Sequence, residues 1–554
     1  MGVLIIDYVA LTPILLIASA FALPLFSLFI KRKVFYDIYA FIATLIAFIL
    51  TLQIAVCVCE RGYPALYPFG GWPPPIGILY EVDAFSAILG VLVSGIILVI
   101  VVYSWWYLKK VTGHAWYYAL LLGMEVGMLG CLYTGDIFNL FVMIEVLAIT
   151  AYSLVAFYRS KLIALEASMK YAFIGAVATT LYFVAVLFIY GAYGTLNMAD
   201  IAIRARTIPP RSIWDGLFVD EFSRNVSILA ISALISTILV LWTITYKAAI
   251  FPNHFWLPDA HPEAPTPISA ALSSVVVGIG AYIAIRWFYT IFGPDSILNN
   301  VLVFNTPARD MILYILMFLG AISSILGALL MVVQRDVKRL LAYSTISHMG
   351  LIIMTISTGL GTVSEITRTL ALTAATYHLI NHALGKALLF LATGILIIKA
   401  GTRDLTRWNG VGKTALLASA TLVIGALHLI GIPPLGGFFS KLMMFQSFIL
   451  SNMVWLVIVL ILESGISIVG YIKLINATIY GKPEAYKESS NNTSVFPYTS
   501  LLILAAACIA SGMLYVSGHV PTYLVDYISE SLGSDGIVKY IDAAKEFITW
   551  YLGK

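Results

Sequence analysis

Long apolar stretches separated by short polar segments recur along the whole chain. A helix needs about 20 mostly apolar residues to cross a bilayer, and a window of about 19 residues finds fourteen such stretches. The pattern therefore predicts an all-α polytopic membrane protein with about 14 transmembrane helices. The predicted spans lie near residues 8–30, 34–57, 83–107, 116–134, 137–158, 163–190, 225–247, 267–292, 311–333, 339–359, 366–399, 414–449 (interrupted), 454–480 and 497–518.

The composition agrees with this pattern. Hydrophobic residues make up 61% of the 554 residues and charged residues only 11%, whereas soluble chains carry about 25% charged residues. A water-soluble globule is therefore excluded. The net charge of +4 is spread along the chain without a basic block, so no nucleic acid partner is expected.

Two proline-rich breaks interrupt the helical pattern, at 252–267 in the seventh span and at Pro433-Pro434 in the twelfth. Interruptions at matching places in two halves of a chain indicate an inverted repeat with an ion path at the broken helices. We therefore predict two inverted five-helix repeats. The division is 1–115 for helices 1–3, 116–292 for the first repeat (helices 4–8), 293–480 for the second repeat (helices 9–13), and 481–554 for helix 14 and an amphipathic tail.

Basic residues in short loops predict the orientation. The loops after odd-numbered helices hold 15 Lys and Arg, and the loops after even-numbered helices hold 6, so both termini are expected outside. The segments 58–82 and 193–224 are long enough to form a lid over the outer face or to serve as plain connections. The tail at 537–551 has one apolar face and is expected to lie along the membrane surface or on a neighbouring subunit.

Many ionisable residues fall inside the predicted spans. A charge near the bilayer centre costs on the order of 2.5 to 3.5 kcal/mol, so each such residue needs a partner or a function. The set comprises Glu125, Glu145, Glu166, Lys170, Lys247, His348, His378, His382, Lys386, His428, Lys441, Glu463 and Lys473.

His378, His382 and Lys386 recur every four residues in the eleventh span. This spacing keeps them on one helix face over a rise of about 12 Å. Histidine titrates near neutral pH and burial moves lysine toward the same range, so the row can carry protons. Alternatively, the histidines hydrogen-bond backbone carbonyl groups between packed helices.

Lys247 precedes the first proline break, and Lys441 follows the second. Unwound backbone at such breaks admits water. Glu145 is the expected counter-ion of Lys247; a movable pair would act as a proton switch, whereas a fixed pair would be a buried salt bridge. Glu166 and Lys170, at i and i+4, are expected to form a static pair within one helix.

The sequence contains no motif for redox or nucleotide chemistry. It contains no G-x-x-x-x-G-K-[ST] or strand-borne G-x-G-x-x-G motif, and its four cysteines, Cys57, Cys59, Cys131 and Cys508, form no cluster-binding set. We therefore expect no cofactor and no redox or hydrolytic centre on this chain. A redox partner would supply its centres from another chain.

Five motifs carry a family resemblance: GDIFNLFVMIEVLAITAYSLVAF (135–157), YKAAIFPNHFWLPDAHPEAPTPISAAL (246–272), RDVKRLLAYSTISHMG (335–350), HLINHALGKALLFLATG (378–394) and GIPPLGGFFSKL (431–442). The chain resembles the antiporter-like proton-translocating subunits of respiratory complex I, membrane-bound hydrogenases and Mrp-type sodium/proton antiporters. In motif it is most similar to the D subunit of the Mrp-type antiporters. The resemblance implies fourteen helices, two inverted repeats, and broken helices seven and twelve.

The resemblance also implies roles for individual residues. It assigns proton translocation to Glu145, Lys247 and Lys441. The proton relay falls on His348, His378, His382 and Lys386.

Two positions depart from the family pattern or add to it. Gly278 stands where many relatives carry a lysine in helix eight, so a connection from Lys247 to helix eleven would need water, or His254 and His261. Glu463 in helix thirteen would either pair with Lys441 or hold a cation such as sodium, which makes it the one candidate metal ligand.

The function expected from the residues and the resemblance is proton translocation, alone or coupled to sodium. The chain would be a membrane subunit of a Mrp-type antiporter or of the membrane arm of a redox-driven complex. Its expected partners are other antiporter-like and small membrane subunits and, in the redox setting, a peripheral redox module, all in the plasma membrane of a prokaryote. The alternatives are a non-transporting structural subunit and a stand-alone solute transporter.

Overall fold

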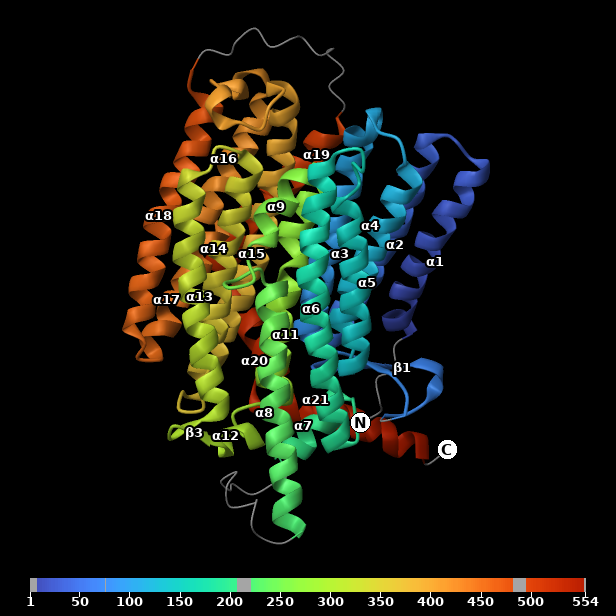
Figure 1. Ribbon diagram of the computed structural model, residues 1–554, viewed down its shortest axis with the longest axis vertical. Helices are drawn as coiled ribbons and strands as arrows, with labels where there is room; N and C mark the ends of the chain where they lie inside the picture. The colour runs from blue at the N-terminus through green and yellow to red at the C-terminus, as the bar shows by residue number, and fades with distance from the viewer. Residues whose placement is uncertain (1–6, 75, 207–220, 482–494, 553–554) are drawn as a thin grey trace.

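The computed structural model describes residues 7–74, 76–206, 221–481 and 495–552. Most helices run roughly along the long axis of one bundle (Figure 1). The first helix begins and the last helix ends at the same end of the bundle, which we call the termini face. The end that carries the loops around Arg335 and Arg403 is called the opposite face.

The elements of the first half begin with α1 (Asp7–Phe29), α2 (Lys33–Arg61), β1 (Ala65–Pro68), β2 (Leu79–Val82), α3 (Ala84–Tyr107), α4 (His114–Tyr133), α5 (Ile137–Val155) and α6 (Leu162–Tyr193). They continue with α7 (Met198–Arg206), α8 (Glu221–Lys247), α9 (Trp256–Glu263), α10 (Thr266–Ala271) and α11 (Gly278–Ile285). Two π-helical turns, η4 (Leu272–Val276) and η5 (Arg286–Ile291), flank α11.

The second half comprises α12 (Ile297–Asn300), β3 (Leu302–Val303), β4 (Thr306–Pro307), α13 (Ala308–Val333), α14 (Val337–Ile356), α15 (Glu365–Ala400), α16 (Leu416–Ile430), α17 (Gly436–Leu450), α18 (Val454–Ile479), α19 (Phe496–Val516), α20 (Val525–Leu532) and α21 (Ser534–Leu552). The described strands form two antiparallel pairs, β1–β2 and β3–β4. These pairs are the small exceptions to the predicted all-α fold.

Within the described residues, 13 helical segments are long and apolar enough to cross a membrane. One of them is the continuous stretch Thr266–Ile291, which passes through α10, η4, α11 and η5. α16 and α17, of 15 residues each, are too short to cross a membrane individually. Placed end to end, the two helices are long enough for one further crossing. The prediction of a polytopic membrane protein with about 14 helices is therefore confirmed. At 36 residues, α15 is about 54 Å long and extends beyond a hydrocarbon core of about 30 Å.

Both proline segments interrupt helices, as predicted. α8 ends at Lys247 and α9 begins at Trp256, while α16 ends at Ile430 and α17 begins at Gly436. Glycine lets the backbone at these breaks pack closely. A Cβ atom on Gly280 would lie 2.2 Å from the Ala248 nitrogen, and one on Gly437 would lie 1.8 Å from the His428 carbonyl oxygen. The chain enters α8 from the termini face and α16 from the opposite face (Figure 1).

Side-chain caps start several helices at their observed first residues. Asp83 accepts a hydrogen bond from the Ser86 amide at the start of α3, and Asp136 accepts one from Asn139 at the start of α5. Asp336 accepts hydrogen bonds from two amides at the start of α14. Each cap satisfies amide groups that a helix leaves without partners at its N-terminus.

The termini face is closed by elements from both ends of the chain. The β1–β2 hairpin occupies part of the predicted lid segment 58–82. In the other predicted lid segment, α7 covers 198–206, and residues 207–220 lie outside the described part. α21 packs against α7, and Lys539 donates a hydrogen bond to the Gly62 carbonyl oxygen (3.1 Å). The described tail residues form a helix, as expected, and its buried side chains pack on its own chain. That this helix lies along the membrane surface or on a neighbouring subunit stays a prediction.

A buried charged cluster lies beneath this cover. Arg286 makes two hydrogen bonds to Asp83, of 2.6 and 2.8 Å, and its guanidinium group stacks near the ring of Tyr540 from α21. Glu81 on β2 is buried beside them. Burial, reinforced by the nearby charge of Asp83, raises the pKa of the Glu81 carboxyl well above its usual range.

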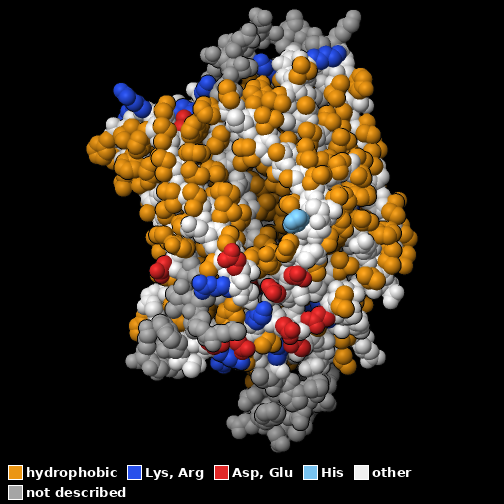
Figure 2. Space-filling view, turned by 180° about the vertical axis from the view of Figure 1, so that it is seen from behind, with side chains coloured by type: hydrophobic (Ala, Val, Ile, Leu, Met, Phe, Trp, Pro, Cys, Tyr) orange, Lys and Arg blue, Asp and Glu red, His pale blue; other side chains and the backbone are white. Residues whose placement is uncertain are grey.

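The exterior and interior of the bundle differ sharply. Figure 2 shows an apolar belt around the face seen there, with charged side chains gathered toward the two ends. Such a belt is expected for a lipid-facing or subunit-facing surface. Every residue of the stretch Thr266–Ile291 is buried, and α15 is largely buried too. The centre of the bundle is therefore built around α11 and α15.

Candidate functional site

A chain of hydrogen-bonded polar side chains crosses the interior of the second repeat. The Lys386 ammonium donates to Ser344 Oγ (2.5 Å), and Ser344 hydrogen-bonds the Tyr471 hydroxyl. The Tyr471 hydroxyl lies 3.2 Å from His348 Nε2. His348 Nδ1 then meets His378 Nε2 at 3.1 Å, and His378 Nδ1 meets Ser440 Oγ at 2.9 Å. We call these six residues the proton chain: Lys386, Ser344, Tyr471, His348, His378 and Ser440.

All six side chains of the proton chain are buried. They come from four helices, α14, α15, α17 and α18. Serine, tyrosine and neutral histidine each donate and accept hydrogen bonds, so a proton can move along the chain by successive transfers. The six side chains therefore form one hydrogen-bonded path through an otherwise apolar interior.

Lys441 and Glu463 form a buried ion pair beside the end of the proton chain. The Lys441 Nζ atom lies 3.3 Å from Glu463 Oε2 and donates to Ser464 Oγ at 3.0 Å. The other carboxylate oxygen, Glu463 Oε1, accepts a hydrogen bond from Ser347 (2.8 Å), the residue next to His348. Of the two arrangements predicted for Glu463, the structure contains the acid–base pair. The described residues hold no group of three or more His, Cys, Asp or Glu side chains placed to bind a metal ion.

The predicted row on α15 is only partly continuous. His378 and Lys386 belong to the proton chain, but neither nitrogen of His382 has a hydrogen-bond partner among the described residues. The His382 ring lies 5.7 Å from that of His348, measured between centroids. The interval between His378 and Lys386 is instead spanned by His348, Tyr471 and Ser344. The alternative interpretation, in which these histidines bond backbone carbonyl groups, is not seen for either of them: His378 bonds two side chains, and His382 has no partner in the described residues. Outside the row, His428 Nε2 does lie 3.0 Å from the backbone oxygen of Asn381.

The first repeat contains Lys247 at the end of α8, next to the break. Its side chain is buried, and its ammonium group makes no hydrogen bond within the described structure. It interacts electrostatically with Cys131 and Glu145. Glu145 lies half-buried on α5, and the two residues form no ion pair within 4 Å. Glu145 therefore acts on Lys247 electrostatically without forming an ion pair with it in this structure.

Other predicted intramembrane charges have ordinary partners. Glu125 accepts a hydrogen bond from Ser94 (2.8 Å). Glu166 and Lys170 form the expected pair within one helix, at 2.8 Å, but both are more than 45% exposed near the start of α6. Such an exposed pair contributes little to stability.

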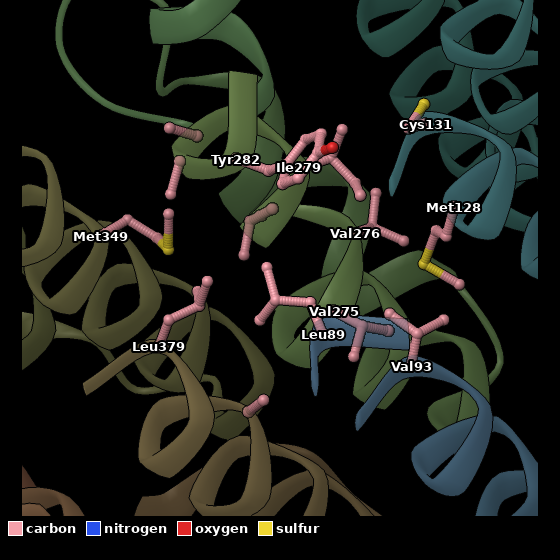
Figure 3. Packing of buried hydrophobic residues seen from close by; sticks show 14 of the residues in the cluster. Leu89, Val93, Met128, Cys131, Val275, Val276, Ile279, Tyr282, Met349 and Leu379 are labelled. Carbon is pink, nitrogen blue, oxygen red and sulfur yellow. The ribbon is translucent and has the colours of Figure 1, made fainter. Parts of the chain in front are cut away.

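An apolar layer separates Lys247 from the proton chain. Leu379 and Met349 face α11 from the second repeat, while Met128 and Cys131 lie on its other side (Figure 3). A Cβ atom on Gly278 would lie 3.3 Å from Leu379 Cδ1. A cavity of about 20 Å³ adjoins this point, lined by Leu89, Leu92, Val93, Leu132, Ser274, Val275, Gly278, Ile279 and Leu379. A cavity of this size has room for one water molecule but offers it few polar partners.

Sequence reasoning missed Tyr471, Ser344, Ser440 and Ser347, which complete the polar network. Ser344 lies one helical turn before His348, and Ser440 immediately precedes Lys441. These spacings could have indicated that both serines lie close to the predicted site residues. Tyr471 lies 123 positions after His348, so no local pattern could link the two residues.

Comparisons with known proteins agree with this architecture. The family described as NADH:quinone oxidoreductase/Mrp antiporter, TM, matches residues 134–467. NADH-quinone oxidoreductase subunit N of Desulforudis audaxviator is 32% identical over 439 residues, covering 78% of this chain and 79% of the relative. The D subunit of the Na(+)/H(+) antiporter of Alkalihalophilus pseudofirmus is 28% identical, covering 80% of this chain and 81% of the relative.

A solved structure extends the similarity over almost the whole chain. A chain of the membrane-bound sulfane sulfur reductase, described as an archaeal respiratory membrane complex, is 28% identical with a TM-score of 0.80. The match covers 97% of this chain and 99% of that chain. The family match spans both broken helices and ends after Glu463, so it includes all the predicted site residues.

Proposed function

Because the chain belongs to the NADH:quinone oxidoreductase/Mrp antiporter transmembrane family, we propose that it moves protons across the membrane. It does so as an antiporter-like subunit of a multisubunit complex. The observation that carries this proposal is the proton chain, whose six buried side chains are linked from Lys386 to Ser440 by hydrogen bonds. An unbroken series of groups that donate and accept protons suits a proton path better than a packing interface does.

In the proposed mechanism, Lys386 and the Lys441–Glu463 pair act at the two ends of the proton chain. Both histidines of the chain interact electrostatically with the Lys441 ammonium. Because like charges repel, a proton that reaches His378 favours weakening of the Lys441–Glu463 pair. Displacement of a proton from that pair would then complete the transfer.

The first repeat supplies a second titratable centre at Lys247. Its distance from Glu145 supports the movable-pair alternative, in which approach of the carboxylate holds the lysine charged and departure releases its proton. A static salt bridge would require the two groups to be in contact. Glu145 and Lys247 are therefore proposed as the switch of the first half.

The setting of the protein follows from its relatives and its surface. We propose other antiporter-like and small membrane subunits as partners, and a peripheral redox module where the complex is redox-driven. Sodium is the proposed coupled ion where the complex is a Mrp-type antiporter, as the name of one relative suggests. Arg335, Arg339 and Arg403 near the opposite face support a cytoplasmic position for that face in a prokaryotic plasma membrane, with the termini outside.

Replacement of Tyr471 with phenylalanine tests the function, because it removes the hydroxyl that joins Ser344 to His348. The variant is purified with its complex and reconstituted into liposomes that contain a pH-sensitive dye. Tyr471→Phe should lower the initial rate of proton uptake by at least about tenfold. Tyr182→Phe is the matched control, because it removes another buried tyrosine hydroxyl, bonded to the Ile137 oxygen (3.2 Å), away from the proton chain.

The two outcomes separate transport from a purely structural role. If both variants assemble and only Tyr471→Phe is impaired, the proton chain is functional. Proton uptake at the parent rate by an assembled Tyr471→Phe complex would overturn the proposed function. It would favour the structural-subunit alternative, in which the polar network only holds helices together.

A further inference from the structure

Lys338 is a buried lysine that the proposed mechanism does not yet use. It lies in the first turn of α14, close to the opposite face, and is 4% exposed. Its ammonium donates to the Ala264 oxygen (2.8 Å) and to Ser269 Oγ (3.2 Å). In the described structure these neutral oxygens are its hydrogen-bond partners. A buried ammonium group without a carboxylate in contact is costly, so a purely structural role would favour a neutral side chain here.

His261 lies beside Lys338 at the end of the first broken helix. The two residues share one hydroxyl group, because Ser269 Oγ also donates to the His261 oxygen (2.8 Å). The imidazole is fully buried, and neither nitrogen has a hydrogen-bond partner among the described residues. Its ring lies 5.1 Å from that of Phe390 on α15, and it interacts electrostatically with both Lys338 and Lys386. His261 is therefore a proton acceptor located between a lysine near the surface and the lysine that begins the proton chain.

A partly exposed ion-pair network lies between Lys338 and solvent. Arg403 pairs with Glu263 at 3.1 Å and with Asp336 at 3.0 Å. The Arg403 side chain is 37% exposed and that of Asp336 is 23% exposed. Both residues also interact electrostatically with Lys338. Water at the opposite face therefore comes close to the buried lysine through a polar boundary.

Protons could instead reach the proton chain from Lys247. On that path they have to cross the apolar layer around Gly278. That layer holds one small cavity lined mainly by leucine and valine. The path from Lys338 through His261 to Lys386 does not cross this layer. Polar groups thus adjoin the proton chain from the opposite face, and apolar side chains adjoin it from the first repeat.

We propose that Lys338 and His261 form the port through which protons from the opposite face reach the proton chain. This inference rests on the proposed function. Lys338 gives a proton to an imidazole nitrogen of His261 and regains one from water at the Asp336–Arg403 network. His261 then gives its proton to the neutral amine of Lys386, after Lys386 has passed its own proton to the chain. One proton enters for each proton that leaves, and no other reactant is required.

The port is tested in the reconstituted complex by measuring proton uptake with liposomes that contain a pH-sensitive dye. Lys338→Met and His261→Phe should each lower the initial rate by at least about tenfold. Lys473→Met is the matched control, because Lys473 also donates to neutral oxygens near the same loop, those of Val332 (2.8 Å) and Gln334 (2.6 Å). It should retain a rate within about twofold of the parent.

One further variant, Lys338→Arg, separates a proton-transfer role of Lys338 from a structural one. Lys338→Arg keeps a cation that can donate to the same oxygens but does not release a proton at working pH. Impairment equal to that of Lys338→Met supports the port, whereas full rescue by arginine shows a structural role and overturns it. If the lysine variants fail to assemble, the rate of His261→Phe decides whether the port exists. The His261 ring makes no hydrogen bond in the described structure, so its replacement with phenylalanine removes none.

Tyr471→Phe, measured in parallel, separates the two proposals. If Tyr471→Phe is impaired while Lys338→Met and His261→Phe transport normally, the port is wrong and the proposed function stands. If all three transport at the parent rate, the proposed function fails and the port fails with it.

Discussion

Replacement of Glu463 with glutamine should destabilise the protein strongly, because it leaves the buried Lys441 ammonium without its counter-ion. At the observed separation of 3.3 Å and an effective dielectric constant of about 20, the attraction between the two charges is about 5 kcal/mol. Removing one partner of a buried pair typically costs about 3–5 kcal/mol. We therefore expect Glu463→Gln to lower the free energy of unfolding by about 3–5 kcal/mol.

Lys441→Met in the same chain should recover much of this loss. A neutral pair of similar volume needs no charge compensation, and such replacements are often neutral or stabilising. The double variant should therefore be more stable than Glu463→Gln alone. Its proton uptake should remain lost, because the residue proposed to act at the end of the proton chain is gone.

The assay combines stability and transport for the parent, both single variants and the double variant. Unfolding is followed by tryptophan fluorescence in mixed micelles, and proton uptake is measured in liposomes that contain the complex. A coupling free energy below about 0.5 kcal/mol in the double-mutant cycle would contradict a direct Lys441–Glu463 ion pair, because residues in contact couple by more than this. Normal proton uptake by the double variant would refute the assigned role of Lys441.

Three further predictions concern the fold. Burial raises the pKa of Glu81, so its contribution to stability is complete below about pH 4.5 and falls by about 1.4 kcal/mol per pH unit as the pH rises toward the raised pKa. The melting temperature of Glu81→Gln minus that of the parent should therefore increase from pH 5 to pH 8. A difference that stays constant over this range would contradict the prediction. Gly437→Ala should prevent assembly, because its Cβ would lie 1.8 Å from a backbone oxygen; Gly465→Ala, which meets no atom within 4 Å, is the control, and equal yields by size-exclusion chromatography would count against the packing argument. Arg286→Lys should lower the free energy of unfolding by about 1–3 kcal/mol, because lysine cannot reproduce the two hydrogen bonds to Asp83; an unchanged urea midpoint would show that the second bond contributes nothing.

The membrane-spanning pattern could be predicted from the sequence because it depends on local composition. The eleventh span was expected at 366–399 and is observed as Glu365–Ala400. The breaks after Lys247 and before Lys441 were recognisable because proline lacks the amide hydrogen that a helix interior needs. The placement of His378 and Lys386 on one face of α15 followed from helical spacing alone.

Contacts between distant segments could not be predicted in the same way. The bond between Tyr471 and His348 depends on how α18 packs against α14, and the separation of Glu145 from Lys247 depends on the face that α5 presents. The tail was correctly expected to be an amphipathic helix. What covers it was missed, because α7 and the β1–β2 hairpin approach it from remote parts of the chain.

The apolar layer around Gly278 has a consequence for energy conservation. A membrane that stores an electrochemical gradient must not leak, and a continuous wire of water and ionisable groups through this subunit would discharge the gradient at rest. The leucine and valine side chains around the 20 Å³ cavity act as electrical insulation between the two halves, since a charge in such a medium is strongly disfavoured. Under the proposed function, a proton could pass from one half to the other only when water transiently enters that layer, so leakage would be rare and the two halves could be driven in turn.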